Sequence, residues 1–256
     1  MKAPYAAATL RRKYKETGIE NIEQIKAYLT ACSNFYYILE TDEAWVILKD
    51  KCGINKEEFN TLLSIMGRDE KLPFYIVPDK ELYIDGTDDL LLVRKAFLRV
   101  DLEGEGIVED WDRFFAMDGQ RAGKRLYIPA DILAYADGEY YEKTPQAQAM
   151  LDFILKIGSV QKDSKTKNSL AECVLVNMID IINDITIPMS KVMEKAICNL
   201  EEYGFKRLSM SQLQQFAELF TNLSNHTRMP CNRGFTPDEM VMMSMKHATA
   251  KPRPLP

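Results

Sequence analysis

Hydrophobic side chains recur at helical spacing through most of the first 70 residues. Ile22, Ile25 and Leu29 repeat every three or four positions, and Phe59 and Leu62 do the same further along. This spacing predicts amphipathic helices. With Gly18, Gly53 and Gly67 as stops and a capping box from Asn55 to Glu58, it predicts helices over 5–15, 22–32, 41–52 and 55–66.

The pattern changes after Gly67. Phe74–Val77 and Glu81–Ile84 are short β-prone runs separated by Pro78-Asp79-Lys80, which predicts a β-hairpin over residues 73–84. Three helices followed by a hairpin is the element order of a winged helix. We therefore expect residues 1–86 to form a winged-helix-like module.

Residues 87–145 are predicted to be a helical connecting region. Helices are expected over 88–100, 109–117 and 129–138, with an acidic loop over 101–106. The region also carries an aromatic cluster in sequence, made of Tyr127, Tyr135, Tyr140 and Tyr141. Such clusters can stack nucleic-acid bases. No Arg/Lys run interleaves with these tyrosines, so we expect them to pin a connecting segment to a core.

The last hundred residues are predicted to be a helical bundle over 146–245, followed by a flexible tail over 246–256. Helices are expected over 145–157, 169–183, 188–203 and 209–226, with a polar linker over 159–168. The helix over 169–183 is apolar nearly all round and should be central. The fold class is thus mainly α: a winged-helix-like module followed by a helical bundle.

Charge and composition limit the function classes. The 256 residues include 33 basic and 38 acidic side chains, a net charge of −5, which disfavours non-specific nucleic-acid binding. No apolar run is long enough to span a membrane, and the first residues lack an apolar signal segment, so we expect a cytosolic protein with no membrane partner. The five cysteines form no C-x-x-C pair, which predicts reduced thiols with no disulfide, zinc or other cofactor.

Two basic segments could form a patch for nucleic acid. The first helix carries Arg11, Arg12 and Lys13, and a loop over 119–125 carries Arg121, Lys124 and Arg125. The two glycines of that loop suggest a phosphate cradle, but the Walker pattern is absent, so a solvated loop is expected. The exposed side of helix 55–66 has paired glutamates, Glu57 and Glu58, which a DNA-reading helix would avoid.

The densest polar motif lies over residues 225–240. Thr236, Pro237 and Glu239 form a second capping box, which predicts a short terminal helix. His226 and Cys231 could form a nucleophile pair, but no third group is placed to orient them. We predict a structural clasp that joins the last long helix to the terminal one. In it, backbone carbonyls across the turn accept hydrogen bonds from the side chains of Asn225, Arg228, Asn232 and Arg233. The clasp residues are Asn225, His226, Arg228, Asn232, Arg233 and Thr236.

Two stretches resemble a group of uncharacterised Firmicutes proteins, common in gut species, that often end in a SEC-C zinc-binding motif. They are Tyr127-Ile128-Pro129 through Tyr140-Tyr141-Glu142-Lys143-Thr144-Pro145, and Asn225-His226-Thr227-Arg228-Met229 through Phe235-Thr236-Pro237-Asp238-Glu239. The resemblance implies a fold rather than an activity. This sequence ends in Lys251-Pro252-Arg253-Pro254-Leu255-Pro256 with no cysteine-rich segment, so zinc binding does not carry over.

A second likeness concerns Asn225, Arg228 and Thr236-Pro237-Asp238-Glu239, which are similar to the end of integrase-type transposase cores. Those enzymes need strand-borne aspartates to hold divalent metals. The 80 residues before this motif have a helical pattern without alternating strands. We therefore reject the transposase activity and retain only a hint of a mobile-element neighbourhood.

These observations favour a non-catalytic interaction or regulatory protein that acts through contacts with a protein partner. The alternative is a nucleic-acid-linked regulator, including a phage- or mobile-element-borne inhibitor of a nucleic-acid-targeting system. An enzyme is the least favoured class because no catalytic set is complete.

Overall fold

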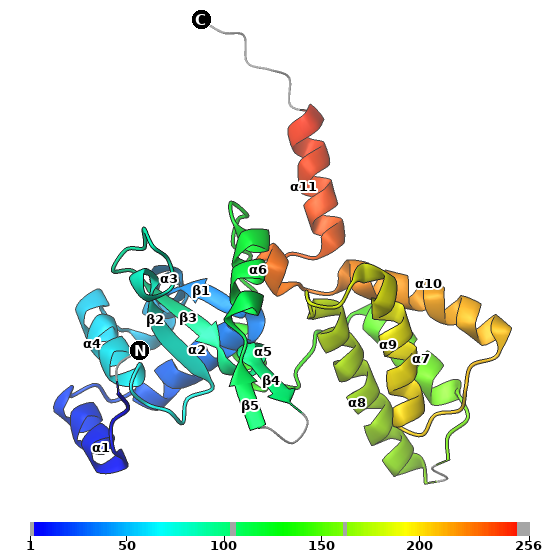
Figure 1. The fold of residues 1–256 in the computed structure, drawn as a ribbon, viewed down its shortest axis with the longest axis horizontal. Coiled ribbons are helices and arrows are strands. Elements are labelled where there is room, and N and C mark those ends of the chain that lie inside the picture. The colour runs from blue at the N-terminus through cyan, green and yellow to red at the C-terminus, as the bar shows by residue number, and fades with distance from the viewer. Residues whose placement is uncertain (1–2, 103–105, 161–162, 250–256) are drawn as a thin grey trace, which may run out of the picture. The chain divides into compact units, whose positions relative to one another are not determined.

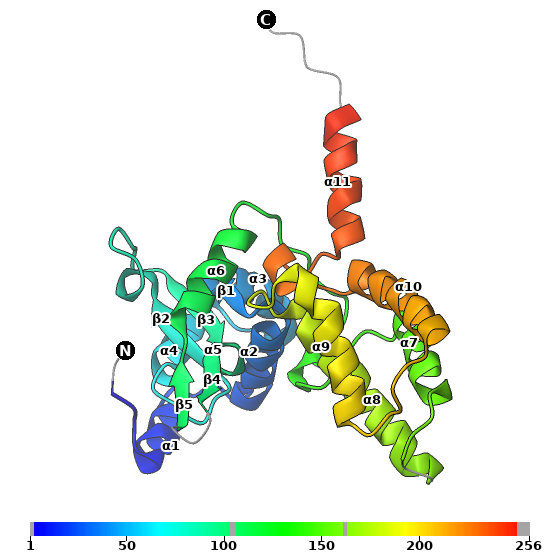
Figure 2. The ribbon, with the colours of Figure 1, turned by 45° about the vertical axis from the view of Figure 1, so that its right-hand side comes forward.

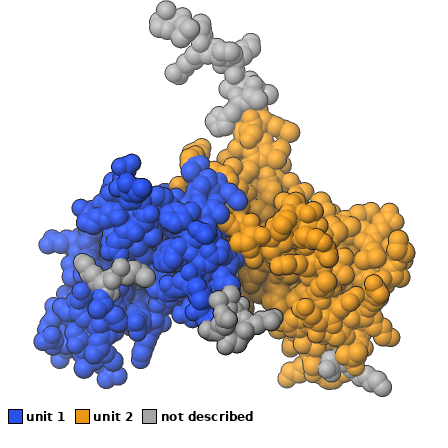
Figure 3. Space-filling view, in the orientation of Figure 1, with its two compact units in different colours: residues 1–122, 127–138 blue, residues 123–126, 139–256 orange. Residues whose placement is uncertain are grey.

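The computed structural model describes residues 3–102, 106–160 and 163–249 (Figure 1). The fold is mainly α with a small antiparallel sheet, as predicted. The chain divides into two compact units, coloured separately in Figure 3. Unit 1 comprises residues 1–122 and 127–138, and unit 2 comprises residues 123–126 and 139–256. The predicted connecting region, residues 87–145, therefore divides between the two units.

The four helices predicted at the start of unit 1 are present. They are α1 (Ala7–Glu16), α2 (Ile22–Tyr36), α3 (Thr41–Cys52) and α4 (Lys56–Met66). The capping box of α4 is confirmed, because Asn55 Oδ1 accepts from the Glu58 amide at 2.9 Å and Glu58 Oε2 accepts from the Asn55 amide at 3.1 Å. Their apolar faces form a core that includes Ile25, Leu29, Phe59 and Leu62.

The hairpin is present, but its second strand differs from the prediction. β2 (Phe74–Pro78) pairs with β3 (Leu90–Arg94), and β1 (Ile38–Glu40) pairs with the other edge of β3. Residues 81–84 are not a strand, and the prediction of a helix over residues 88–100 is wrong. The central strand β3 has Leu91, Leu92 and Val93 all buried, and a continuous apolar run does not distinguish a central strand from a helix.

The chain after β3 is also more extended than expected. A single helical turn, α5 (Lys95–Leu98), leads into β4 (Arg99–Leu102), which pairs with β5 (Gly106–Glu109). Residues 103–105 of the predicted acidic loop lie outside the described residues. The helix expected over 109–117 is α6 (Trp111–Arg121), which extends into the predicted loop over 119–125.

The predicted aromatic cluster divides between the two units. Tyr127 and Tyr135 belong to unit 1, whereas Tyr140 and Tyr141 belong to unit 2. In place of the 129–138 helix, a short 3-10 turn, η2 (Ile132–Ala136), packs on α2. The ring centroids of Phe35 and Tyr135 lie 4.5 Å apart, and the Tyr36 hydroxyl donates to the Tyr127 carbonyl at 2.6 Å. These two tyrosines pin the segment to the core, as predicted.

Unit 2 contains the four predicted bundle helices: α7 (Pro145–Lys156), α8 (Ser164–Asn183), α9 (Met189–Glu202) and α10 (Met210–His226). α8 begins five residues before the expected start, inside the predicted linker, of which residues 161–162 lie outside the described residues. It is not buried all round: one stripe, including Val174 and Met178, enters the core, while Cys173 is exposed.

The chain ends with a short 3-10 turn, η3 (Pro230–Asn232), and the terminal helix α11 (Pro237–Thr249). α11 continues through residues 246–249, which were expected to belong to the flexible tail. The rest of that tail, residues 250–256, lies outside the described residues. Figures 1 and 2 both show α11 standing clear of the other helices of its unit.

Candidate functional site

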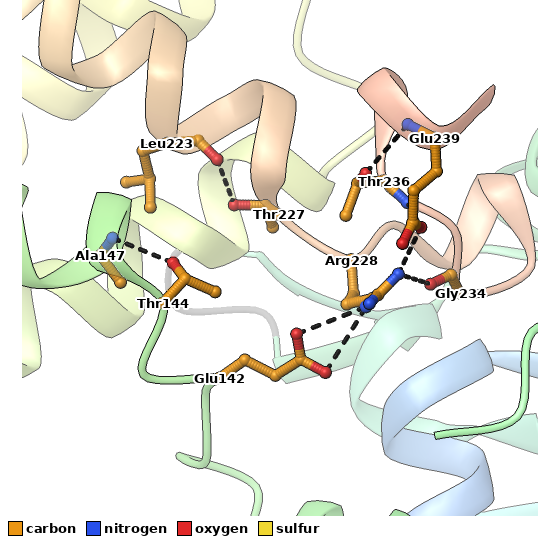
Figure 4. Close-up of polar contacts among 9 residues, drawn as sticks. All are labelled: Glu142, Thr144, Ala147, Leu223, Thr227, Arg228, Gly234, Thr236 and Glu239. Carbon is orange, nitrogen blue, oxygen red and sulfur yellow. Dashed lines mark hydrogen bonds and ion pairs between the residues drawn. The ribbon is translucent and has the colours of Figure 1, made fainter. Parts of the chain in front are cut away.

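The Arg228 guanidinium joins three segments of unit 2 (Figure 4). Its Nε lies 3.3 Å from Glu142 Oε2, in the segment before α7, and its Nη1 donates to the Gly234 carbonyl at 3.4 Å. The same Nη1 forms an ion pair with Glu239 in the first turn of α11. Because these charged groups are partly buried and paired with one another, they hold the chain segments together and do not present a reactive group to a ligand.

Thr236 and Glu239 form the predicted capping box at the start of α11. Thr236 Oγ1 accepts from the Glu239 amide at 3.2 Å, and Glu239 Oε2 accepts from the Thr236 amide at 3.0 Å. Thr236 is buried. The Glu239 carboxylate therefore serves the cap and Arg228 together, which ties the helix start to the preceding loop.

The turn between α10 and α11 needs two consecutive left-handed residues. Arg233 has a φ of 53° and Gly234 a φ of 88°. Arg233 is a non-glycine residue in a region that L side chains rarely adopt. Its side chain donates to the Lys124 carbonyl at 3.3 Å, and the Lys124 amine donates to the Cys231 carbonyl and to Asn232 Oδ1, each at 2.8 Å.

The predicted bond to a backbone carbonyl across the turn is present at Arg228, which donates to Gly234. Arg233 donates to the carbonyl of Lys124, which lies outside the turn. The Asn232 amide instead donates to the Met229 sulfur at 3.7 Å. The Asn225 side chain forms no hydrogen bond with the described residues, so the prediction that it bonds a backbone carbonyl was wrong. An amide side chain offers no sequence signal that separates a bracing role from a solvated one.

His226 and Cys231 are not arranged as a nucleophile and base. His226 Nδ1 lies 2.9 Å from the Asn222 carbonyl, and its Nε2 lies 3.6 Å from Asp238 Oδ2. Burial raises the pKa of the Cys231 thiol, although the nearby Lys124 charge opposes this effect. A thiol with a raised pKa carries little thiolate at neutral pH and is a poor nucleophile.

Arg121 does not belong to a solvated basic loop. It ends α6 with only 5% of its surface exposed, and its guanidinium contacts Glu40 Oε1 and Asp118 Oδ1, each at 2.8 Å. Burial alone would raise the pKa of Glu40, but side-chain hydrogen bonds with Glu43 and Arg121 and the Arg121 charge lower it to about 2. The sequence analysis placed Arg121 in a loop over 119–125, whereas α6 continues to this residue.

The other residues of the predicted basic patch differ in their exposure and in their contacts. Arg11, Arg12 and Arg125 are exposed, and Arg12 Nε lies 3.6 Å from Glu16. The Lys13 amine lies 5.2 Å from the Tyr5 ring centroid. Arg11, Arg12, Lys13 and Arg121 belong to unit 1, and Lys124 and Arg125 to unit 2, so neither compact unit by itself gathers the six residues.

Within the described ranges, no three His, Cys, Asp or Glu side chains come together in a way that could hold a metal ion. No described helix has the length and apolar character needed to cross a membrane. No protein-family model, no curated protein and no solved structure matches this chain.

Proposed function

We propose that this chain is a non-catalytic interaction protein that acts through contacts with another protein, and that α11 is its contact surface. The observation that carries the proposal is the exposure of apolar side chains on this helix. Val241, Met242 and Met245 are 52%, 61% and 63% exposed. Adjacent apolar side chains on a helix that stands clear of its own bundle are typical of a helix that docks into a partner's hydrophobic groove.

The clasp supports this assignment. Arg228, Thr236 and Glu239 bond to one another and to Glu142, so their polar groups are used within unit 2. Their role is then to hold the base of α11, while methionine side chains supply a flexible, polarizable apolar surface for a partner.

Unit 1 is proposed to be a winged-helix-like module used for packing or protein contact. After α1, its order of helix (α2), strand (β1), two helices (α3 and α4) and hairpin (β2 and β3) supports the proposal, with the sheet order β1-β3-β2. The exposed side of α4 carries Glu57 and Glu58, which would repel phosphates. The ion pairs of Arg121 further weaken a nucleic-acid function for this unit.

A cytosolic location is part of the same proposal. All five cysteines are free thiols, and Cys32 and Cys52 are buried. Reduced cysteines are typical of a reducing compartment.

The test compares partner capture by variants of the full chain. We expect Met242→Asp combined with Met245→Asp to abolish capture of a partner by affinity isolation and native mass spectrometry, without a change in melting temperature. Met189→Asp is the matched control, because Met189 is 84% exposed at the start of α9, where an added carboxylate is tolerated. Equal capture by the double variant, a homodimer in place of a foreign partner, or a lone monomer under every condition would contradict the proposal.

A further inference from the structure

An open pocket of about 370 Å³ lies within unit 1, beside β2 and the turn that follows α4. The N-terminal residues Ala3 and Pro4 contribute to its lining. They are held there because the Tyr5 amide donates to the Arg68 carbonyl at 3.0 Å, and the Arg68 guanidinium stacks on the Tyr5 ring at 4.4 Å. The pocket is thus a feature of the folded unit rather than a gap beside a loose end.

Lys95, the first residue of α5, supplies a buried amine to this pocket. Only 7% of the residue is exposed, and its Nζ donates to the Glu70 carbonyl at 2.9 Å. The amine lies 4.7 Å from the Tyr75 ring centroid. Its backbone is fixed beside β2, because the Lys95 amide donates to the Pro73 carbonyl at 2.9 Å. No carboxylate of the described residues forms an ion pair with it.

This environment lowers the pKa of the amine. Burial lowers the pKa of Lys95, and the charge of Arg99 lowers it further, while Glu70 and Asp69 partly oppose the shift. A desolvated lysine near another cation is the usual setting of a nucleophilic amine.

The lining also indicates which ligands would fit. Met66, Phe74 and Ile76 provide apolar surface, which suits an apolar body. The charged side chains of the lining are three carboxylates, Asp69, Glu70 and Glu109, against two cations, Arg68 and Lys95. An anionic ligand would therefore meet an excess of negative charge, whereas a neutral one would not.

We propose that Lys95 anchors a small-molecule site in this pocket, which takes a neutral aldehyde with an apolar body and holds it as an imine. The neutral amine attacks the carbonyl carbon, so that a C–N bond forms and the C=O π bond breaks, and a proton moves from nitrogen to oxygen to give a carbinolamine. The C–O bond then breaks, and the hydroxyl group leaves as water with the remaining N–H proton, which gives the C=N bond. The step needs no oxidant or reductant, is reversible, and is independent of the contact surface proposed for α11.

The test is reductive trapping on the full chain with benzaldehyde and cyanoborohydride near neutral pH, followed by peptide mass spectrometry. We expect Lys95 to be labelled several times more strongly than the exposed Lys51 and Lys71, and its labelling to persist to lower pH than theirs. Pyridoxal phosphate, an anionic aldehyde, should label Lys95 less selectively. Labelling that follows exposure, with Lys95 among the slowest lysines, would overturn the proposal.

Two variants separate the pocket from the amine. Ala3→Trp changes an exposed lining residue and should reduce labelling of Lys95 while leaving Lys71 unchanged, because it fills part of the pocket. Lys95→Met keeps an unbranched side chain and removes the amine, so benzaldehyde should raise the melting temperature of the parent but not of this variant. Unchanged Lys95 labelling in Ala3→Trp, or an equal melting shift in Lys95→Met, would also overturn the proposal.

Discussion

Arg228 brings three segments of unit 2 together through one guanidinium group, so its loss should lower the stability of the fold. Arg228→Ala would leave Glu142 and Glu239 without their cation, at a cost of about 1–3 kcal/mol, and Thr236→Ala would remove a cap at about 1 kcal/mol. Both variants should melt at a lower temperature and still capture the partner once folded. Thermal melts and capture assays on the same samples measure both effects.

Asn225→Ala is the matched control for these two variants. The Asn225 side chain makes no hydrogen bond with the described residues, so its loss should leave the melting temperature unchanged. A rival hypothesis makes the clasp itself a contact or catalytic surface. Unchanged melting with lost capture in Arg228→Ala and Thr236→Ala would favour that rival.

The contribution of Glu40 to the stability of unit 1 should depend on pH. Its folded pKa of about 2 lies below the ordinary glutamate value of about 4.3, so the stabilisation is complete above that value and is lost as the pH falls toward 2. Because Glu40 is partly exposed, we expect about 1–2 kcal/mol after solvent screening. Denaturant unfolding of the parent and of Glu40→Gln between pH 2 and about 6 measures the difference. A difference between the two proteins that does not shrink as the pH falls would count against the contacts of Glu40 with Glu43 and Arg121 as its source.

At the scale of elements, the strand assignment in unit 1 can be tested by truncation. Leu92 is fully buried in the central strand β3, so Leu92→Ala should destabilise by about 2–5 kcal/mol. Ile84 lies in the run that the sequence predicts as a strand, yet it is fully exposed, so Ile84→Ala should change the free energy of unfolding by less than about 0.5 kcal/mol. Equilibrium unfolding in urea compares them. The reverse order would restore residues 81–84 as the second hairpin strand.

The same elements show which parts of the fold can be predicted from the sequence. Helices with caps and one apolar face were predicted, because each signal is local: Asn55 with Glu58, and Thr236 with Glu239. The partner of β2 was missed because strand pairing is non-local. A turn signal at Pro78 favoured the nearest β-prone run, while the true partner begins twelve residues later.

The clasp was predicted in part for a similar reason. Thr236 and Glu239 lie three residues apart, and their reciprocal bonds follow from helix geometry. Glu142 lies 86 residues before Arg228, and Lys124 lies 107 before Cys231. No spacing rule selects one acidic or basic residue among many at such separations, so both partners emerged only from the fold.

For the whole molecule, net charge predicts the behaviour toward nucleic acids. A chain of net charge −5, with Arg121 and Lys124 already bonded internally, should not retain duplex or single-stranded probes at physiological salt. Fluorescence anisotropy across a salt series is the measurement. Binding that persists at that salt and is lost in Arg11→Glu combined with Arg12→Glu would revive the nucleic-acid alternative; Lys51→Glu, an exposed lysine on another helix, is its control.

The thioether groups exposed on α11 make the proposed contact surface sensitive to oxidants. Addition of oxygen to Met242 or Met245 converts an apolar side chain into a polar sulfoxide, which would weaken docking into a hydrophobic groove. Mild peroxide treatment should therefore release a captured partner, and methionine sulfoxide reductase should restore it. Replacing both residues by leucine should keep capture and remove the response to peroxide. A release that persists in that variant would place the oxidisable group elsewhere.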